Sequence, residues 1–188
     1  MKTKKEYFRI KAKFQDYFSK HKVMQFGEMF FRLYNPFVDE IVSQYSRQDW
    51  NKIFINTTED DIKDLSTCSN VVILIWCESI TNSARGMVYL EENYNNPREV
   101  KFHGGTWDHN PKFYFRIFQS IVKLFDFILT SNVIITTSCT HENTIADKFQ
   151  RSLGFEEVDK DNTTIYKILN NQKFKESDFV NTMRIRKQ

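Results

Sequence analysis

The sequence predicts a single α/β domain built around one sheet. The run 71–77 is continuously apolar and the run 133–137 is entirely β-branched, and both suit buried strands of an α/β protein. The segment 111–130 instead repeats apolar residues at helical spacing. With 188 residues and 40% hydrophobic content, the chain is long enough to bury one sizeable core.

The first third of the chain gives less regular signals. Ile10, Ala12 and Phe14 alternate with basic residues, which predicts a half-buried first strand over about 8–14. We expect two or more helices over 16–50, with Pro36 marking a break between them. A capping pattern that starts at Thr58 predicts one further short helix over 59–65.

The middle of the chain predicts three antiparallel strands and a long helix. The strands are expected at 71–77, 86–90 and 98–103, because turn residues separate these runs. The helix is expected over 111–130 with Asn110 as its N-cap, since proline is tolerated at the first helical position.

The next elements are expected to be a strand at 133–137, a helix from Asn143, and two short strands at 156–158 and 164–169. Asn143 is a candidate N-cap for the helix, and Gly154 suits the left-handed residue that ends one. Apolar residues at helical spacing are expected to pack on the sheet; they are Ile145, Phe149 and Leu153.

Composition and residue spacing limit the metals, the location and the partners expected for the protein. The three cysteines and four histidines show no zinc-binding spacing, so we expect no metal. No apolar signal core lies within the first 20 residues and no segment is apolar enough to span a bilayer, so we expect a cytoplasmic protein without a membrane partner. A net charge of +3 argues against nucleic acid as the main partner, and self-association is left open.

The segment 143–155 carries a family signal. Asn143, Ala146, Gly154 and Phe155 stand at the spacing of the second signature of the GCN5-related N-acetyltransferase (GNAT) superfamily, which the chain therefore resembles. The resemblance implies a mixed central sheet of about six or seven strands with helices on both faces, over a core of about 5–169. Residues 170–188 form a basic extension, expected to be either a flexible tail or a packed last element.

The resemblance also implies acetyl-CoA as cosubstrate, with its pantetheine arm between the strands at 98–103 and 133–139. The chain departs from the family at the pyrophosphate loop, because Gly104 and Gly105 come earlier than the family's glycines and Asp108 opposes a phosphate. The residues expected at the cofactor are Phe102, Gly104, Gly105, Asn110, Lys112, Thr137, Asn143, Ala146, Lys148 and Arg151.

The expected chemistry needs a base that removes a proton from the amine, and an acid or polarised environment that assists departure of the thiolate. His103 is the leading base and Glu99, on the same face of its strand, is the second candidate. The position of the family's tyrosine holds Gln150, which cannot supply a proton; Tyr166 and Tyr114 are the substitutes. Cys139 would suit a covalent acyl-enzyme route, but a buried structural cysteine is the favoured interpretation.

The sequence thus favours acetyl-CoA-dependent N-acetylation of a primary amine on a small molecule or protein. The aromatic and acidic residues before position 41 are the expected acceptor surface; they are Phe26, Met29, Phe30, Phe31, Tyr34 and Phe37, with Glu28, Asp39 and Glu40. The alternative is a non-catalytic binding or assembly module that has lost the pyrophosphate loop and the tyrosine, with a groove blocked by Trp107 or Phe102. A nucleic-acid binder that uses the basic first segment and tail is the weaker third interpretation.

Overall fold

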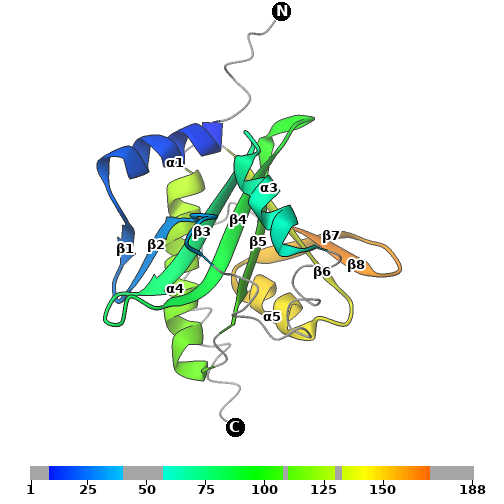
Figure 1. The fold of residues 1–188 in the computed structure, drawn as a ribbon. Coiled ribbons are helices and arrows are strands. Elements are labelled where there is room, and N and C mark those ends of the chain that lie inside the picture. The colour runs from blue at the N-terminus through cyan, green and yellow to red at the C-terminus, as the bar shows by residue number, and fades with distance from the viewer. Residues whose placement is uncertain (1–8, 40–56, 108–109, 130–132, 170–188) are drawn as a thin grey trace, which may run out of the picture. The chain divides into compact units, whose positions relative to one another are not determined.

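The computed structural model describes residues 9–39, 57–107, 110–129 and 133–169 (Figure 1). These residues form a mixed α/β fold with eight strands and four helices, slightly more strands than the six or seven expected. The chain divides into two compact units, residues 1–133 and 134–188, which are described in turn.

The first unit is built on a five-stranded antiparallel meander in the order β1-β2-β3-β4-β5. The strands are β1 (Met24–Phe26), β2 (Met29–Leu33), β3 (Val71–Glu78), β4 (Ala84–Asn93) and β5 (Asn96–Thr106). The helices are α1 (Arg9–Lys20), α3 (Glu59–Thr67) and α4 (Pro111–Leu129). All eight residues of β3 are buried, as expected for a central strand with cover on both faces.

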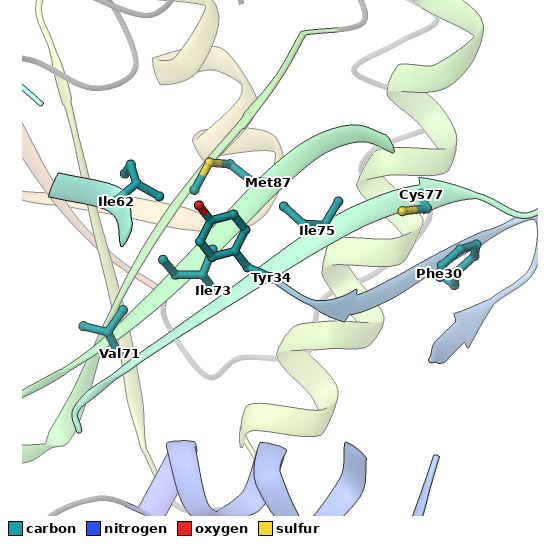
Figure 2. Close-up of a cluster of buried hydrophobic side chains, with 8 residues drawn as sticks. All are labelled: Phe30, Tyr34, Ile62, Val71, Ile73, Ile75, Cys77 and Met87. Carbon is teal, nitrogen blue, oxygen red and sulfur yellow. The ribbon is translucent and has the colours of Figure 1, made fainter. Parts of the chain in front are cut away.

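Side chains of alternating β3 residues pack toward opposite faces of this sheet. On one face, Ile62 of α3 joins Ile73, Ile75 and Met87 in a core cluster of buried side chains (Figure 2). On the other, Phe102 of β5 makes an edge contact with a phenylalanine of α4 at a ring-centroid distance of 4.9 Å. The predicted cover of both sheet faces by helices is therefore confirmed in this unit.

The expected first strand is wrong, because residues 9–20 form α1. Ile10 and Phe14 are also four residues apart, the spacing of one helical face, and both are almost fully buried. The basic residues between them, Lys11 and Lys13, do not simply point into solvent. The Nζ of Lys11 donates to the carbonyl of Cys68 at the end of α3, and that of Lys13 donates to the carbonyl of Phe127 at 2.5 Å.

The N-terminal end of α1 is held by a buried carboxylate. The backbone N–H of Ile10 donates to Oε1 of Glu92 on β4 at 3.0 Å, and Glu92 is only 2% exposed. The first N–H groups of a helix have no partner within it, and negative charge is favourable there. Side-chain contacts therefore attach α1 to β4, α3 and α4.

The helices expected over 16–50 are also wrong after residue 20, where β1 and β2 follow. Met29, Phe30 and Phe31 are successive buried residues, so β2 is covered on both faces and its sequence lacks a two-residue alternation. Pro36 lies in a turn, consistent with the expected break. Residues 40–56, where the rest of this prediction falls, lie outside the described residues.

The other predicted elements of the first unit are confirmed. Thr58 and Asp61 form a reciprocal capping box at the start of α3. The strands expected from residue 71 to residue 103 are β3, β4 and β5, and α4 begins at Pro111 as predicted.

The second unit is a three-stranded antiparallel sheet in the order β6-β8-β7, with one helix. Its elements are β6 (Ile134–Thr140), α5 (Thr144–Ser152), β7 (Phe155–Lys160) and β8 (Thr164–Leu169). Gly154 has a φ of 91° and ends α5 as predicted. Leu153 is buried, but Ile145 is 72% exposed, so the expectation that Ile145 packs on the sheet is wrong.

None of the described helices is long and apolar enough to cross a membrane. All three cysteines are free thiols. The expected basic extension, 170–188, lies outside the described residues.

Candidate functional site

The start of α5 has the geometry expected from the signature segment. The side-chain oxygen of Asn143 accepts a hydrogen bond from the backbone N–H of Ala146 at 3.1 Å, so Asn143 is the N-cap. This bond occupies one N–H of the first turn, while the helix start remains a region of positive potential. The arrangement therefore combines a fixed cap with an end suited to polar or anionic ligands.

Gln150, at the position of the family's tyrosine, points into the second unit. Its Nε2 donates to Oγ1 of Thr137 and to the carbonyl of Ser138, both at 3.1 Å, and its Oε1 accepts from Lys167 at 2.7 Å. Both amide hydrogens are thus used on β6, and the side chain is 7% exposed. The hydrogen bonds of Gln150 therefore connect α5 to the sheet.

Lys167 is the residue that sequence reasoning missed. Its side chain is 0% exposed, and besides Gln150 its Nζ contacts Oδ1 of Asp147 at 2.8 Å and Sγ of Cys139 at 3.0 Å. Lysine is rarely fully buried without such partners. No short-range pattern predicts it, because the partners come from β6 and α5.

In the first unit, His103 stacks on Tyr89 of the neighbouring strand. The ring centroids are 4.3 Å apart and the planes differ by 9°. Burial, assisted by the charge of Lys101, lowers the pKa of His103 to about 4. Burial also raises the pKa of Tyr89 to about 12, so neither ring is charged near neutral pH.

Glu99 and Phe102 lie on β5, and Trp107 follows directly after it. Glu99 accepts a hydrogen bond from Nδ2 of Asn93 at 2.8 Å. Phe102 is 3% exposed and packs against α4, as part of the core of this unit. Trp107 donates its ring N–H to the carbonyl of Ala84 at 3.0 Å and packs on the core cluster.

The Gly104–Gly105 pair does not form a bulge. Both glycines keep regular register with β4, opposite Val88 and Met87. The close approach is at Gly86, where an added Cβ would lie 2.4 Å from the carbonyl oxygen of Gly105. The glycines therefore let the ends of β4 and β5 run close together.

At the start of α4, the carbonyl of Asn110 accepts from the N–H of Phe113 at 2.9 Å. Lys112 belongs to the first turn of this helix, but its side chain lies outside the described part of the chain. Residue 108, whose charge was expected to oppose a phosphate here, also lies outside the described residues.

The remaining cofactor and acid candidates belong to the second unit. Arg151 is engaged with Asp147 at 3.1 Å and Glu157 at 2.9 Å, whereas Lys148 is exposed. Tyr166 donates to Oδ2 of Asp161 at 3.0 Å, and this hydrogen bond and the carboxylate charge raise the pKa of Tyr166.

The expected acceptor surface falls on β1, on β2 and on the segment directly after β2. Met29, Phe30, Phe31 and Tyr34 are buried, whereas Phe37 is 95% exposed.

Of the acidic residues of this surface, Asp39 and Glu28 are paired, and Glu40 lies outside the described residues. Asp39 forms a bidentate ion pair with Arg32. Burial alone would raise the pKa of Asp39, but hydrogen bonds from Arg32 and Asn35 outweigh it and hold the pKa below its usual value. Glu28 pairs with Arg116 at 2.5 Å.

A second charged group joins the β3–β4 turn to α4. Glu78 binds Arg85 at 2.8 Å and lies 3.6 Å from Arg116. The hydrogen bond from Arg85, followed by that from Thr81, lowers the pKa of Glu78. The two guanidinium groups also lie 4.8 and 5.7 Å from the centroid of the Phe113 ring.

Among the described residues, no group of three or more metal-ligating side chains could hold a metal ion.

Comparison with solved structures identifies the fold. A GNAT-family acetyltransferase from Bacillus anthracis superposes with a TM-score of 0.66 at 12% identity, over 80% of this chain and 99% of that one. Ribosomal-protein-S5-alanine acetyltransferase from Vibrio fischeri gives 0.60 at 12% identity, over 81% and 98%. Spermidine N-acetyltransferase from Vibrio cholerae, solved with CoA and spermine, gives 0.58 at 16% identity, over 76% and 95%.

The chain therefore has the fold of the GNAT acetyltransferases. No family model matches its sequence, and no curated protein matches it either.

Proposed function

We propose that the protein is an acetyltransferase that uses acetyl-CoA to acetylate a primary amine. The observation that carries this proposal is α5, where the Asn143 cap, Ala146 and the left-handed Gly154 keep the family signature on a fold shared with acetyltransferases. The neighbour solved with CoA and spermine supports this class of cosubstrate and acceptor.

In the proposed reaction, the amine nitrogen attacks the thioester carbon, the C–S bond breaks, and the nitrogen loses a proton. We assign the proton to His103, which is neutral above its pKa of about 4. General bases this weak work best late in the step, when the bond to carbon has made the nitrogen acidic. The acceptor is therefore expected to react as the neutral amine.

The leaving thiolate has no acid at Gln150, whose amide bonds lie within the second unit. Tyr166 is the described tyrosine candidate, but its hydrogen bond to Asp161 and its raised pKa make it a weak acid. A thiol with a pKa of about 8.5 or below can leave as the thiolate near neutral pH. We therefore propose that CoA leaves without a proton from the protein.

The test is acetylation of an amine panel by the full chain with acetyl-CoA, read by mass spectrometry and by release of free CoA thiol. The panel contains a polyamine, a peptide N-terminus, a lysine peptide and an amino sugar.

We expect His103→Ala to lower kcat at least ~10²-fold with little change in acetyl-CoA affinity, as for a lost base. His21→Ala, an exposed histidine after α1, is the control and should keep full activity.

The pH profile gives a second reading of the same assignment. The pH dependence of kcat/KM reports ionisations of the free enzyme. After correction for protonation of the amine substrate, kcat/KM should decrease on the acid side with a midpoint near pH 4, the pKa of His103. Unchanged turnover in His103→Ala would remove His103 from the reaction. If no amine is acetylated, the non-catalytic module becomes the better explanation.

A further inference from the structure

The second unit contains a buried lysine cluster, made of Lys167, Cys139, Asp147 and Gln150. The Nζ of Lys167 is 3.0 Å from Sγ of Cys139, 2.8 Å from Oδ1 of Asp147 and 2.7 Å from Oε1 of Gln150. An ammonium group has three N–H donors, and these three acceptors use all of them. The sulfur and the nitrogen are thus direct neighbours.

The backbone keeps this pair together. In the β6–β8 ladder Cys139 is opposite Ile165 and Lys167 is opposite Thr137, so the two residues are diagonal neighbours. Diagonal neighbours on one sheet face are within reach of long side chains. A covalent bond between them would join two strands that are already paired and would need no chain rearrangement.

The environment of Cys139 differs from that of the other cysteines. Cys77 is buried beside Arg32, whose guanidinium lowers the pKa of this thiol while burial, the larger effect, raises it. Lys11 binds the backbone carbonyl of Cys68 and not its sulfur. Within the described residues, Cys139 is the cysteine whose sulfur accepts a hydrogen bond from a lysine amine.

We propose that peroxide converts Cys139 and Lys167 into a reversible sulfur–nitrogen crosslink. Peroxide first transfers one oxygen to the thiol, which gives the sulfenic acid and one molecule of water or alcohol. Lys167 then gives one proton to the carboxylate of Asp147, and its nitrogen lone pair attacks Sγ. The S–O bond breaks, and the oxygen leaves as water with a second proton from the nitrogen.

Asp147 is placed to accept the first proton. Burial alone would raise its pKa, but hydrogen bonds from Lys167 and Arg151 outweigh burial and keep it ionised. Once the amine becomes neutral, Arg151 still contacts Asp147 at 3.1 Å. Cys139 is 9% exposed while the side chain of Lys167 is 0% exposed, so Cys139 is the residue of this pair that lies nearer to solvent.

The crosslink has a distinct chemical consequence. It removes the buried positive charge that contacts Gln150 Oε1 and Cys139, and it ties β8 to β6. A sulfenamide is opened by thiols, which attack sulfur and release the amine. The crosslink forms whether or not the protein transfers acetyl groups.

The test is peptide mass spectrometry of the full chain after treatment with hydrogen peroxide, without acetyl-CoA. We expect one linked pair of peptides that contain Cys139 and Lys167, about 2 Da lighter than their sum, because formation of the bond removes two hydrogens. Dithiothreitol should restore both free peptides. Cys77, in the same sample, serves as a buried cysteine that should form no lysine link.

Two variants separate this link from other oxidation. Cys139→Ser should abolish the linked pair, and Lys167→Arg, which keeps the charge, should leave Cys139 to advance to the sulfinic acid. The wild-type result is sufficient if Lys167→Arg does not fold. Recovery of unmodified Lys167 beside a sulfinic or unreacted Cys139 in the wild type would overturn the proposal.

Discussion

At the scale of single residues, the environment of His103 changes its protonation. Its ring is stacked on Tyr89, and burial lowers its pKa to about 4 from the ordinary value of 6.5. The unfolded chain therefore binds more protons than the folded chain between these two values. By linkage, folding stability must fall as the pH drops from about 6.5 toward 4.

We expect this histidine to contribute about 1–2 kcal/mol to the loss of stability between pH 7 and pH 5. His103→Gln, which does not titrate, should unfold in urea with a correspondingly smaller change in the free energy of unfolding over this range. The measurement compares both proteins at each pH. An identical pH dependence in the variant would mean that His103 is accessible to protons in the folded chain.

Residue-scale prediction from sequence succeeded where the signal was local. Asn143 as N-cap and Gly154 as helix stop depend only on neighbours in sequence, and both are confirmed. Lys167 could not be predicted, since its burial depends on Asp147 and Gln150, 20 and 17 positions earlier in the chain.

At the scale of elements, α1 shows why alternation can mislead. Ile10 and Phe14 fit a strand and a helix equally well, and only their contacts decide. The lysines between them bind carbonyls at the ends of other helices, where cations are favourable. They therefore hold α1 in place, although a basic run usually indicates a solvated face.

Replacement of Lys13 tests this role. Lys13→Met keeps much of the apolar stem but loses the bond to the Phe127 carbonyl and the contact of Nζ with the Phe127 ring, 4.4 Å from its centroid. We expect a loss of about 1–2 kcal/mol in the free energy of unfolding, measured in urea. Lys20→Met removes an exposed ion pair with Asp16 and should cost about 0.5 kcal/mol or less. Equal costs would argue against a role in anchoring α1.

Whether each of the other elements could be predicted depends on whether its sequence pattern is local. The strands β3 to β5 and the helix α4 were predictable, because apolar runs, turn residues and helical spacing are all local. The strand β2 was not, because Phe30 and Phe31 are buried on opposite faces and the alternation disappears. Burial on both faces follows from tertiary packing, which one sequence does not encode in short-range spacing.

At the scale of the whole molecule, the four signature residues within 143–155 are enough to indicate the GNAT fold from the sequence alone. The superpositions confirm that fold at identities of 12–16%, where chemistry is not carried over with the backbone. The two departures from the family remain in the structure as a regular Gly104–Gly105 strand and a buried Gln150. Cosubstrate binding is therefore the central claim.

The most direct measurement is calorimetric titration of the full chain with acetyl-CoA, with adenosine diphosphate as control ligand. We expect a Kd on the order of micromolar for acetyl-CoA, clearly tighter than for the control. Asn143→Asp keeps a good N-cap but adds negative charge at the start of α5, so it should weaken acetyl-CoA binding without loss of helix. No heat of binding with folded wild-type protein would contradict the account and favour a binding module instead.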